Sequence, residues 1–297
     1  MRRDTFSAVP SPQTVESVDA SRTSFDDPAR PRPVRMYLWE PLVRPADGRT
    51  RLILLSHGTG ASGRDLAWLA EPLAQAGFLV AAVDHHGNNW VDGYAAQGFI
   101  RVWERPADLR HALDLIERTR DVDWVGAAGF SAGGYTAAAL VGVRLDPDLF
   151  ERLVRGELPD PEIPEYPDAF ASLRRTTTPG AIGDLLTSAS GDQSDDRVRA
   201  AFLICPGDGG LASATSLRAV NRPVEIRWAD ADVITPPEQT ALRYLSLIGG
   251  ARGESLGQYV EHHHLFPDAD EGTAARTRAG TDAVAFLARV SALDQPS

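Results

Sequence analysis

Short apolar segments alternate with segments of helical spacing along most of this chain, and that alternation restricts its fold more than any other feature. Three nearly continuous apolar runs are typical of strands buried on both faces, at residues 51–56, 78–83 and 124–128. Each is followed by residues with helical spacing, at 65–76, 106–119 and 132–143. Strand and helix in alternation predict an α/β fold, with a mostly parallel sheet and helices on both faces.

The same alternation extends over the rest of the chain. Further strands are expected at residues 34–39, 200–205, 224–228 and 254–260, and further helices at 237–248 and 273–290. Residues 1–14 are polar and contain two prolines, which predicts a flexible arm. We therefore expect a single domain over residues 15–297.

One stretch, residues 144–199, interrupts the alternation. It contains six prolines and many acidic residues. Because a structureless loop of this length is uncommon within a domain, we expect a few short helices packed over the sheet edge or over a site. We interpret the stretch as a lid insertion.

Composition excludes several classes of function. The 30 basic residues are all arginine and are outnumbered by 41 acidic ones, giving a net charge of −11 that disfavours nucleic-acid binding. The lack of lysine excludes Schiff-base chemistry. No apolar run approaches the roughly 18 residues that a membrane span needs. The single cysteine, Cys205, and the lack of a recognisable signal segment predict a cytoplasmic location.

The segment Gly129-Phe130-Ser131-Ala132-Gly133 matches the pattern G-x-S-x-G between a predicted strand and a predicted helix. A serine on a sharp strand-to-helix turn is exposed at the sheet edge, and glycines remove side chains that would clash there. The helix that follows points its N–H groups at developing negative charge. Ser131 is therefore the candidate nucleophile, with the N–H of Ala132 as one oxyanion donor.

A serine nucleophile needs a base and an acid that orients the base, expected in the order Ser, Asp, His. Two aspartates, Asp230 and Asp232, follow the predicted strand at 224–228. Three adjacent histidines, at positions 262–264, follow the strand predicted to end near residue 260. Both groups thus come at strand ends, where ligands bind in parallel sheets.

With these motifs the chain resembles the α/β-hydrolase superfamily, and within it the dienelactone hydrolase-like and platelet-activating-factor acetylhydrolase-like esterases. The resemblance covers about residues 15–290. It rests on the serine turn, the segment from Asp230 to Pro237, and three further motifs: Ser56-His57-Gly58-Thr59-Gly60, Asp84-His85-His86-Gly87-Asn88 and His263-His264-Leu265-Phe266.

The resemblance implies specific residue roles. The pattern G-x-x-D before a turn and proline favours Asp232 over Asp230 as the triad acid. The pattern H-x-x-F, ending at Phe266, favours His263 over its two neighbours as the base. The loop after the strand at 51–56 implies Thr59 as the second oxyanion donor. We expect His57 to shape that loop.

Together these features predict a serine hydrolase that cleaves a small-molecule carboxylic ester, thioester or lactone, with a lean toward apolar substrates. No metal or organic cofactor is expected. Acyl transfer, amide cleavage or a lyase step on the same triad stay open, as does a ligand-binding protein without catalysis. The sequence leaves the oligomeric state open.

Overall fold

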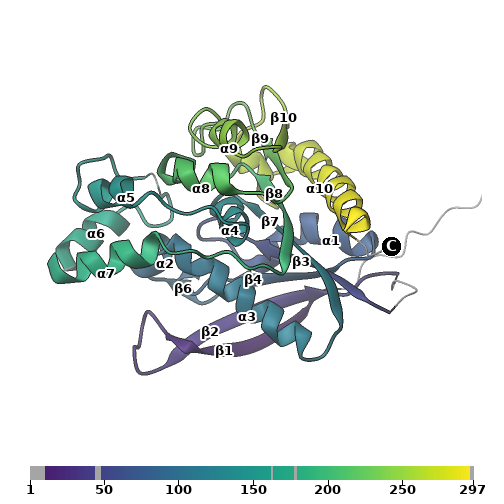
Figure 1. The fold of residues 1–297 in the computed structure, drawn as a ribbon, viewed down its shortest axis with the longest axis horizontal. Helices are drawn as coiled ribbons and strands as arrows, with labels where there is room; N and C mark the ends of the chain where they lie inside the picture. Colours follow the sequence, from purple (N-terminus) through teal and green to yellow (C-terminus); the bar gives the residue numbers. More distant parts are fainter. Residues whose placement is uncertain (1–10, 44–47, 162, 177–178, 295–297) are drawn as a thin grey trace, which may run out of the picture.

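The computed structural model describes residues 11–43, 48–161, 163–176 and 179–294, and an eight-stranded sheet runs through it (Figure 1). In sheet order its strands are β1 (Gln13–Thr23), β2 (Pro31–Trp39), β4 (Leu79–Asp84), β3 (Thr50–Ser56), β7 (Val122–Phe130), β8 (Val198–Ile204), β9 (Val224–Trp228) and β10 (Arg252–Ser255). A separate two-stranded ribbon consists of β5 (Asn88–Asn89) and β6 (Gly93–Tyr94).

Helices connect and cover these strands. The α-helices are α1 (Ala67–Gln75), α2 (Ala96–Ile100), α3 (Arg105–Glu117), α4 (Ala132–Leu140), α5 (Pro147–Val154), α6 (Ala169–Thr176), α7 (Pro179–Ala189), α8 (Ala214–Ala219), α9 (Ala241–Leu247) and α10 (Thr273–Leu293). The short 3₁₀ helices are η1 (Gly63–Leu66), η2 (Val102–Glu104), η3 (Gly209–Leu211), η4 (His262–Leu265) and η5 (Asp270–Gly272).

The sheet is mostly parallel, which confirms the predicted fold class. Strands β4, β3, β7, β8, β9 and β10 pair in parallel, whereas β2 pairs antiparallel with both β1 and β4. Parallel strands place their carboxyl ends at one edge of the sheet, so the turns after β3, β7, β8 and β9 come together there.

Successive side chains of β3 enter two different cores. Leu52 and Leu54 face α3 and α4, while Ile53 and Leu55 face α1 and α10, and all four are fully buried. This two-sided burial is why the strand reads as a continuous apolar run. Each such side chain contributes about 1.5–3 kcal/mol relative to an exposed one, so the sheet centre is a rigid support for the turns at its edge.

The stretch at 144–199 contains three helices, α5, α6 and α7, which Figure 1 shows grouped at one end of the molecule. They are joined to the main core through buried apolar side chains, among them Phe150, Leu153, Phe170 and Leu185. Short helices were expected here. The interpretation of this stretch as a lid insertion stays a prediction.

Two strands of the main sheet depart most from the sequence-based expectation. Strand β1 was not predicted, because it is a largely exposed edge strand with polar residues, and it begins at Gln13 within the expected arm. The rest of that arm, residues 1–10, lies outside the described residues. Strand β10 ends at Ser255 rather than near residue 260. Among the described helices, none is long and apolar enough to cross a membrane.

Candidate active site

Ser131 occupies a strained turn between β7 and α4. Its backbone has φ +57° and ψ −124°, a conformation that residues other than glycine rarely adopt. Hydrogen bonds hold the turn on both sides: Ser131 N–H donates to the carbonyl of Ile204 at 2.9 Å, and Gly207 N–H donates to the carbonyl of Ser131 at 2.9 Å. A Cβ at Gly133 would lie 1.9 Å from the carbonyl oxygen of Ser56, so only glycine fits there.

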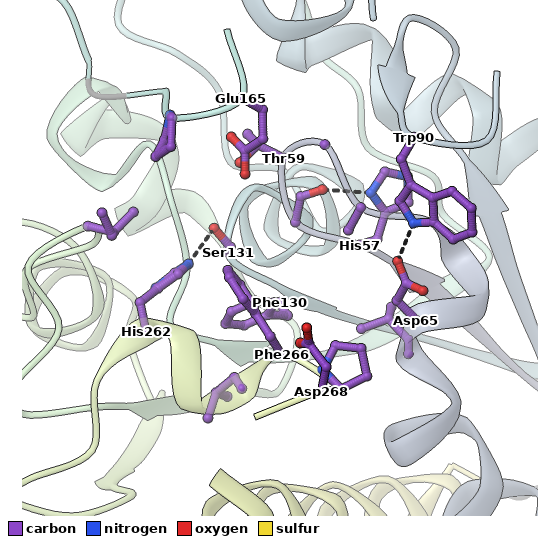
Figure 2. Close-up of a pocket in the computed structure, with 18 of the residues that line it drawn as sticks. His57, Thr59, Asp65, Trp90, Phe130, Ser131, Glu165, His262, Phe266 and Asp268 are labelled. Carbon is purple, nitrogen blue, oxygen red and sulfur yellow. Dashed lines mark hydrogen bonds between the residues drawn. The ribbon is translucent and has the colours of Figure 1, made fainter. Parts of the chain in front are cut away.

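A line of hydrogen bonds joins Ser131 to His262 and Asp232. The Nε2 atom of His262 lies 3.0 Å from Ser131 Oγ, and its Nδ1 atom lies 2.7 Å from Asp232 Oδ2. Figure 2 marks the contact between His262 and Ser131 with a dashed line. The serine follows β7, the aspartate follows β9, and the histidine opens η4. These separations are those that nucleophile, base and orienting acid require.

Several donors hold the carboxylate of Asp232 ionised and fixed. Its Oδ1 accepts the N–H groups of Ile234 at 2.9 Å and Thr235 at 2.8 Å, and its Oδ2 accepts the Thr235 hydroxyl at 2.7 Å. Burial raises the pKa of Asp232, but the hydrogen bonds from His262 and Thr235 outweigh it, so the net shift is downward. A buried anion is thus kept beside the imidazole.

The structure corrects the choice of His263, because it places His262 at Ser131 instead. A 3₁₀ helix has three residues per turn, so consecutive residues of η4 point about a third of a turn apart. With His262 directed inward, His263 is 47% exposed and faces Glu261 and Glu271 at 3.3 and 3.5 Å. His264 turns back to accept the N–H of Glu261 at 2.9 Å.

The family pattern led to the wrong histidine because the spacing to the phenylalanine differs by one residue. Phe266 still packs edge-on against the imidazole of His262, with ring centroids 6.1 Å apart. Asp230, the alternative to Asp232, points elsewhere and accepts the Trp228 indole N–H at 2.8 Å and the Ser255 hydroxyl at 2.6 Å.

The two expected oxyanion donors flank Ser131. Ala132 is the first residue of α4, so its N–H has no acceptor within the helix. The loop after β3 passes close to the nucleophile, since a Cβ at Gly58 would lie 3.3 Å from Ser131 Cβ. Thr59, in that loop, and Ala132 line the same cavity as Ser131. Their role as donors stays a prediction.

Two cavities open beside Ser131. The larger, of about 450 Å³, is lined by aromatic residues including Trp68, Trp90, Tyr94, Phe130 and Phe266, several of which appear in Figure 2. The smaller, of about 120 Å³, is lined mainly by apolar side chains from α2, α5, α6 and the segments next to them.

Comparison with solved structures finds several chains of similar fold. A ferulic acid esterase from Streptomyces cinnamoneus matches with a TM-score of 0.62 and 20% identity, over 98% of this chain and 95% of that one. Est1E from Butyrivibrio proteoclasticus gives 0.55 and 12%, over 94% and 100%. The acylaminoacyl peptidase of Pyrococcus horikoshii gives 0.58 and 13%, over 96% of this chain but only 42% of the peptidase. No family model and no curated protein sequence matches the chain.

The chain has the α/β-hydrolase fold. The resemblance seen in the sequence is therefore confirmed at the level of fold. At these identities the likeness establishes the fold alone, and activity has to be argued from the site.

A buried histidine, His57, lies in the loop that follows β3, residues 57–60 of this α/β-hydrolase fold, and its contacts are structural. Its Nε2 accepts the N–H of His85 at 3.1 Å, and its Nδ1 lies 2.6 Å from the carbonyl of Gly58. Burial, aided by the charge of Arg105, lowers the pKa of His57 well below its usual value. A neutral imidazole with Nδ1 protonated satisfies both contacts, so His57 shapes the loop.

The second buried histidine, His85, ties the same loop to α3. Its Nδ1 lies 2.8 Å from Asp108 Oδ2 and its Nε2 lies 2.8 Å from the Ser56 hydroxyl. Burial and the nearby charge of Arg105 lower the pKa of His85 to about 4. Arg105 itself donates to the carbonyl of His57.

Arg105 and Asp108 lie at the start of α3, where the sequence predicted no more than a helix over residues 106–119. The signal that could have revealed their contacts was an arginine and an acid one turn apart at the helix start, both of which are buried in the structure. Asp108 also accepts from Arg22 of β1 at 2.6 Å, so the unpredicted edge strand completes this network.

Two sets of potential metal ligands occur in the described part of the chain. In the first, Cys205 joins Asp232 and His262, but the latter two are already hydrogen-bonded to each other. Burial raises the pKa of the Cys205 thiol well above its usual value, which disfavours the thiolate that a metal needs. The second set, His263, His264 and Glu271, lies at the surface.

Proposed function

We propose that this protein is a serine hydrolase that cleaves carboxylic esters through Ser131, His262 and Asp232. The observation that supports the proposal is a continuous chain of hydrogen bonds beside a cavity. Ser131 Oγ lies 3.0 Å from His262 Nε2, and His262 Nδ1 lies 2.7 Å from Asp232 Oδ2. A serine hydroxyl is a weak nucleophile alone, and this arrangement supplies both its base and the group that orients the base.

In the proposed mechanism, Ser131 Oγ attacks the acyl carbon while His262 Nε2 accepts the hydroxyl proton. Asp232 holds Nδ1–H in place and stabilises the imidazolium that forms. The N–H groups of Thr59 and Ala132 bind the oxyanion of the tetrahedral intermediate. His262 then donates its proton to the leaving oxygen, and a water molecule repeats the sequence on the acyl-enzyme.

None of these steps requires a metal or an organic cofactor. A thioester or lactone would acylate Ser131 in the same way, and we include in the proposal the narrower assignment to dienelactone hydrolase-like esterases. The structural neighbours are named as esterases and as peptidases, so an amide substrate belongs in the first panel of tests.

The test is hydrolysis of ester, thioester, lactone and amide substrates by the native chain and by Ser131→Ala. We expect ester cleavage by the native chain, reduced at least a thousandfold in the variant. The matched control is Ser246→Ala, an exposed serine whose hydroxyl donates to the carbonyl of Arg243 at 3.0 Å, and it should retain activity. Equal activity of the native chain and Ser131→Ala would remove Ser131 as nucleophile.

A further inference from the structure

The two cavities lie on different sides of the nucleophile and share few residues. Thr59, Ser131 and Ile234 line both. Since the acyl carbon of an ester bonded to Ser131 carries one acyl group and one leaving group, the two cavities can receive the two halves of the ester separately. Which half enters which cavity follows from the position of the acid that protonates the leaving oxygen.

His262 lines the larger cavity, together with Leu265, Phe266 and Pro267 from the end of η4 and the residues after it. It is not among the residues that line the smaller one. The leaving oxygen must come within hydrogen-bond reach of His262 Nε2 to receive its proton. The leaving group therefore extends into the larger cavity.

The smaller cavity lies on the side of Ala132 and Gly207, next to the expected oxyanion donors. Its walls are fixed: Phe99 and Phe150 are 2% and 1% exposed, and Phe150 packs edge-on against Trp103 with ring centroids 5.1 Å apart. Ile163, from the segment before α6, is 8% exposed. Enlarging this space would require buried side chains to move, which well-packed cores resist.

The volumes set the size of each half. A cavity of about 150 Å³ in an apolar core holds a benzene molecule. At about 120 Å³, the smaller cavity falls short of a phenyl ring and suits an acyl group of about two to four carbons. The larger cavity, at about 450 Å³, holds a fused aromatic ring, and Trp90, Tyr94 and Phe266 on its wall are 48%, 43% and 41% exposed.

We propose that the substrates are esters of short-chain acids with large, apolar, preferably aromatic alcohols. This inference rests on the proposed ester hydrolysis. The acyl group binds in the cavity lined by Phe99, Phe150 and Ile163. The alcohol binds against Trp90 and the other aromatic residues of the larger cavity. Ile163 limits acyl length, and Trp90 favours a large leaving group.

Two isomeric esters test the assignment directly: 2-naphthylmethyl acetate, with the ring on the alcohol, and methyl 2-naphthylacetate, with the ring on the acid. They have the same composition and are both alkyl esters, so their intrinsic reactivity is similar. We expect kcat/KM to favour the acetate at least tenfold. Equal values, or a preference for the naphthylacetate, would overturn the assignment.

A series of p-nitrophenyl esters measures the acyl limit. We expect kcat/KM to be similar from acetate to butyrate and to fall at least tenfold by octanoate. An octanoate hydrolysed as well as the butyrate would contradict a closed acyl cavity of this size.

A substitution in either cavity should change only the substrate preference that this cavity sets: acyl length for the smaller one and alcohol size for the larger one. Ile163→Ala enlarges the acyl cavity, so kcat/KM for the p-nitrophenyl esters should begin to fall at a longer acyl chain. Val102→Ala changes another residue of the same wall and replaces Ile163→Ala if that variant is unstable. Trp90→Ala should reduce the advantage of the naphthylmethyl acetate and leave the acyl limit unchanged. An acyl limit unmoved by both wall variants would refute the role of this cavity.

The same measurements distinguish a failure of the cavity assignment from a failure of the proposed ester hydrolysis. Hydrolysis of the esters with the reverse selectivity would refute the assignment of cavities and leave the triad intact. A folded native chain that hydrolyses none of the esters would refute the proposed function, and this inference with it.

Discussion

Lowering the pH from 7.5 to 5.0 should reduce the free energy of unfolding, because two histidines at the loop after β3, His57 and His85, are buried in the neutral form. His85 has a pKa of about 4 in the folded chain and an ordinary value of about 6.5 when unfolded. The unfolded state therefore takes up a proton below pH 6.5 that the folded state does not. The loss is about 1.4 kcal/mol per pH unit, or about 2 kcal/mol at pH 5.

Other buried groups modify that figure. His57 and His86 act in the same direction, since burial lowers their pKa values too. Asp208 and Asp84 act against the histidines, because burial raises the pKa of each carboxyl, to about 6 for Asp208, and the folded state then binds the extra proton. Between pH 7.5 and pH 5.0 the Asp208 carboxyl restores about 1.4 kcal/mol. The histidines outweigh the carboxyls, so a net loss is expected.

Urea unfolding at pH 7.5, 6.0 and 5.0 measures the change, with the slope in urea checked for constancy. Asp208→Asn is the matched variant: it removes the opposing proton uptake, so its loss between pH 7.5 and 5.0 should exceed that of the native chain by about 1.4 kcal/mol. A native stability that is constant or rises from pH 7.5 to 5.0 would refute the view that both histidines are held neutral.

Three further predictions concern the site. Asp232→Asn should leave the fold intact and reduce kcat by about four orders of magnitude, because the amide no longer holds the imidazole tautomer; steady-state kinetics checks this. Gly133→Ala should lose activity and soluble yield, since its Cβ would meet the carbonyl of Ser56; thermal unfolding and labelling of Ser131 measure it. An ester whose alcohol bears a carboxylate should be a poor substrate, because Glu165 and two other carboxylates line the larger cavity and none of its described lining residues is arginine; Glu165→Gln should narrow the difference in KM between that ester and its neutral analogue.

The sheet centre and the serine turn were predictable because their signals are local. A strand buried on both faces has to be apolar throughout, as residues 52–55 are, and a strained turn has to be lined with glycine. The position after β9 limited the candidate acid to Asp230 or Asp232, and the family resemblance favoured Asp232, which lies 2.7 Å from the imidazole of His262.

Long-range geometry is what the sequence did not reveal. Each of three adjacent histidines has the same chemistry, and only the rotation of η4 decides that His262 rather than His263 faces Ser131. Strand β1 is mostly exposed, so it lacks the apolar pattern by which strands are recognised, yet its Arg22 reaches Asp108 across 86 positions of sequence. The hydrogen-bond network beneath the loop after β3 depends on such long-range pairings.

The most direct test of the central claim compares the rates at which a fluorophosphonate labels the native chain, His262→Ala and His263→Ala, followed by intact mass. We predict a single adduct on the native chain, which is lost in Ser131→Ala. Labelling of His263→Ala should be within about twofold of native, and labelling of His262→Ala should be slower by at least a hundredfold. A slow His263→Ala beside a fast His262→Ala would contradict the triad described here.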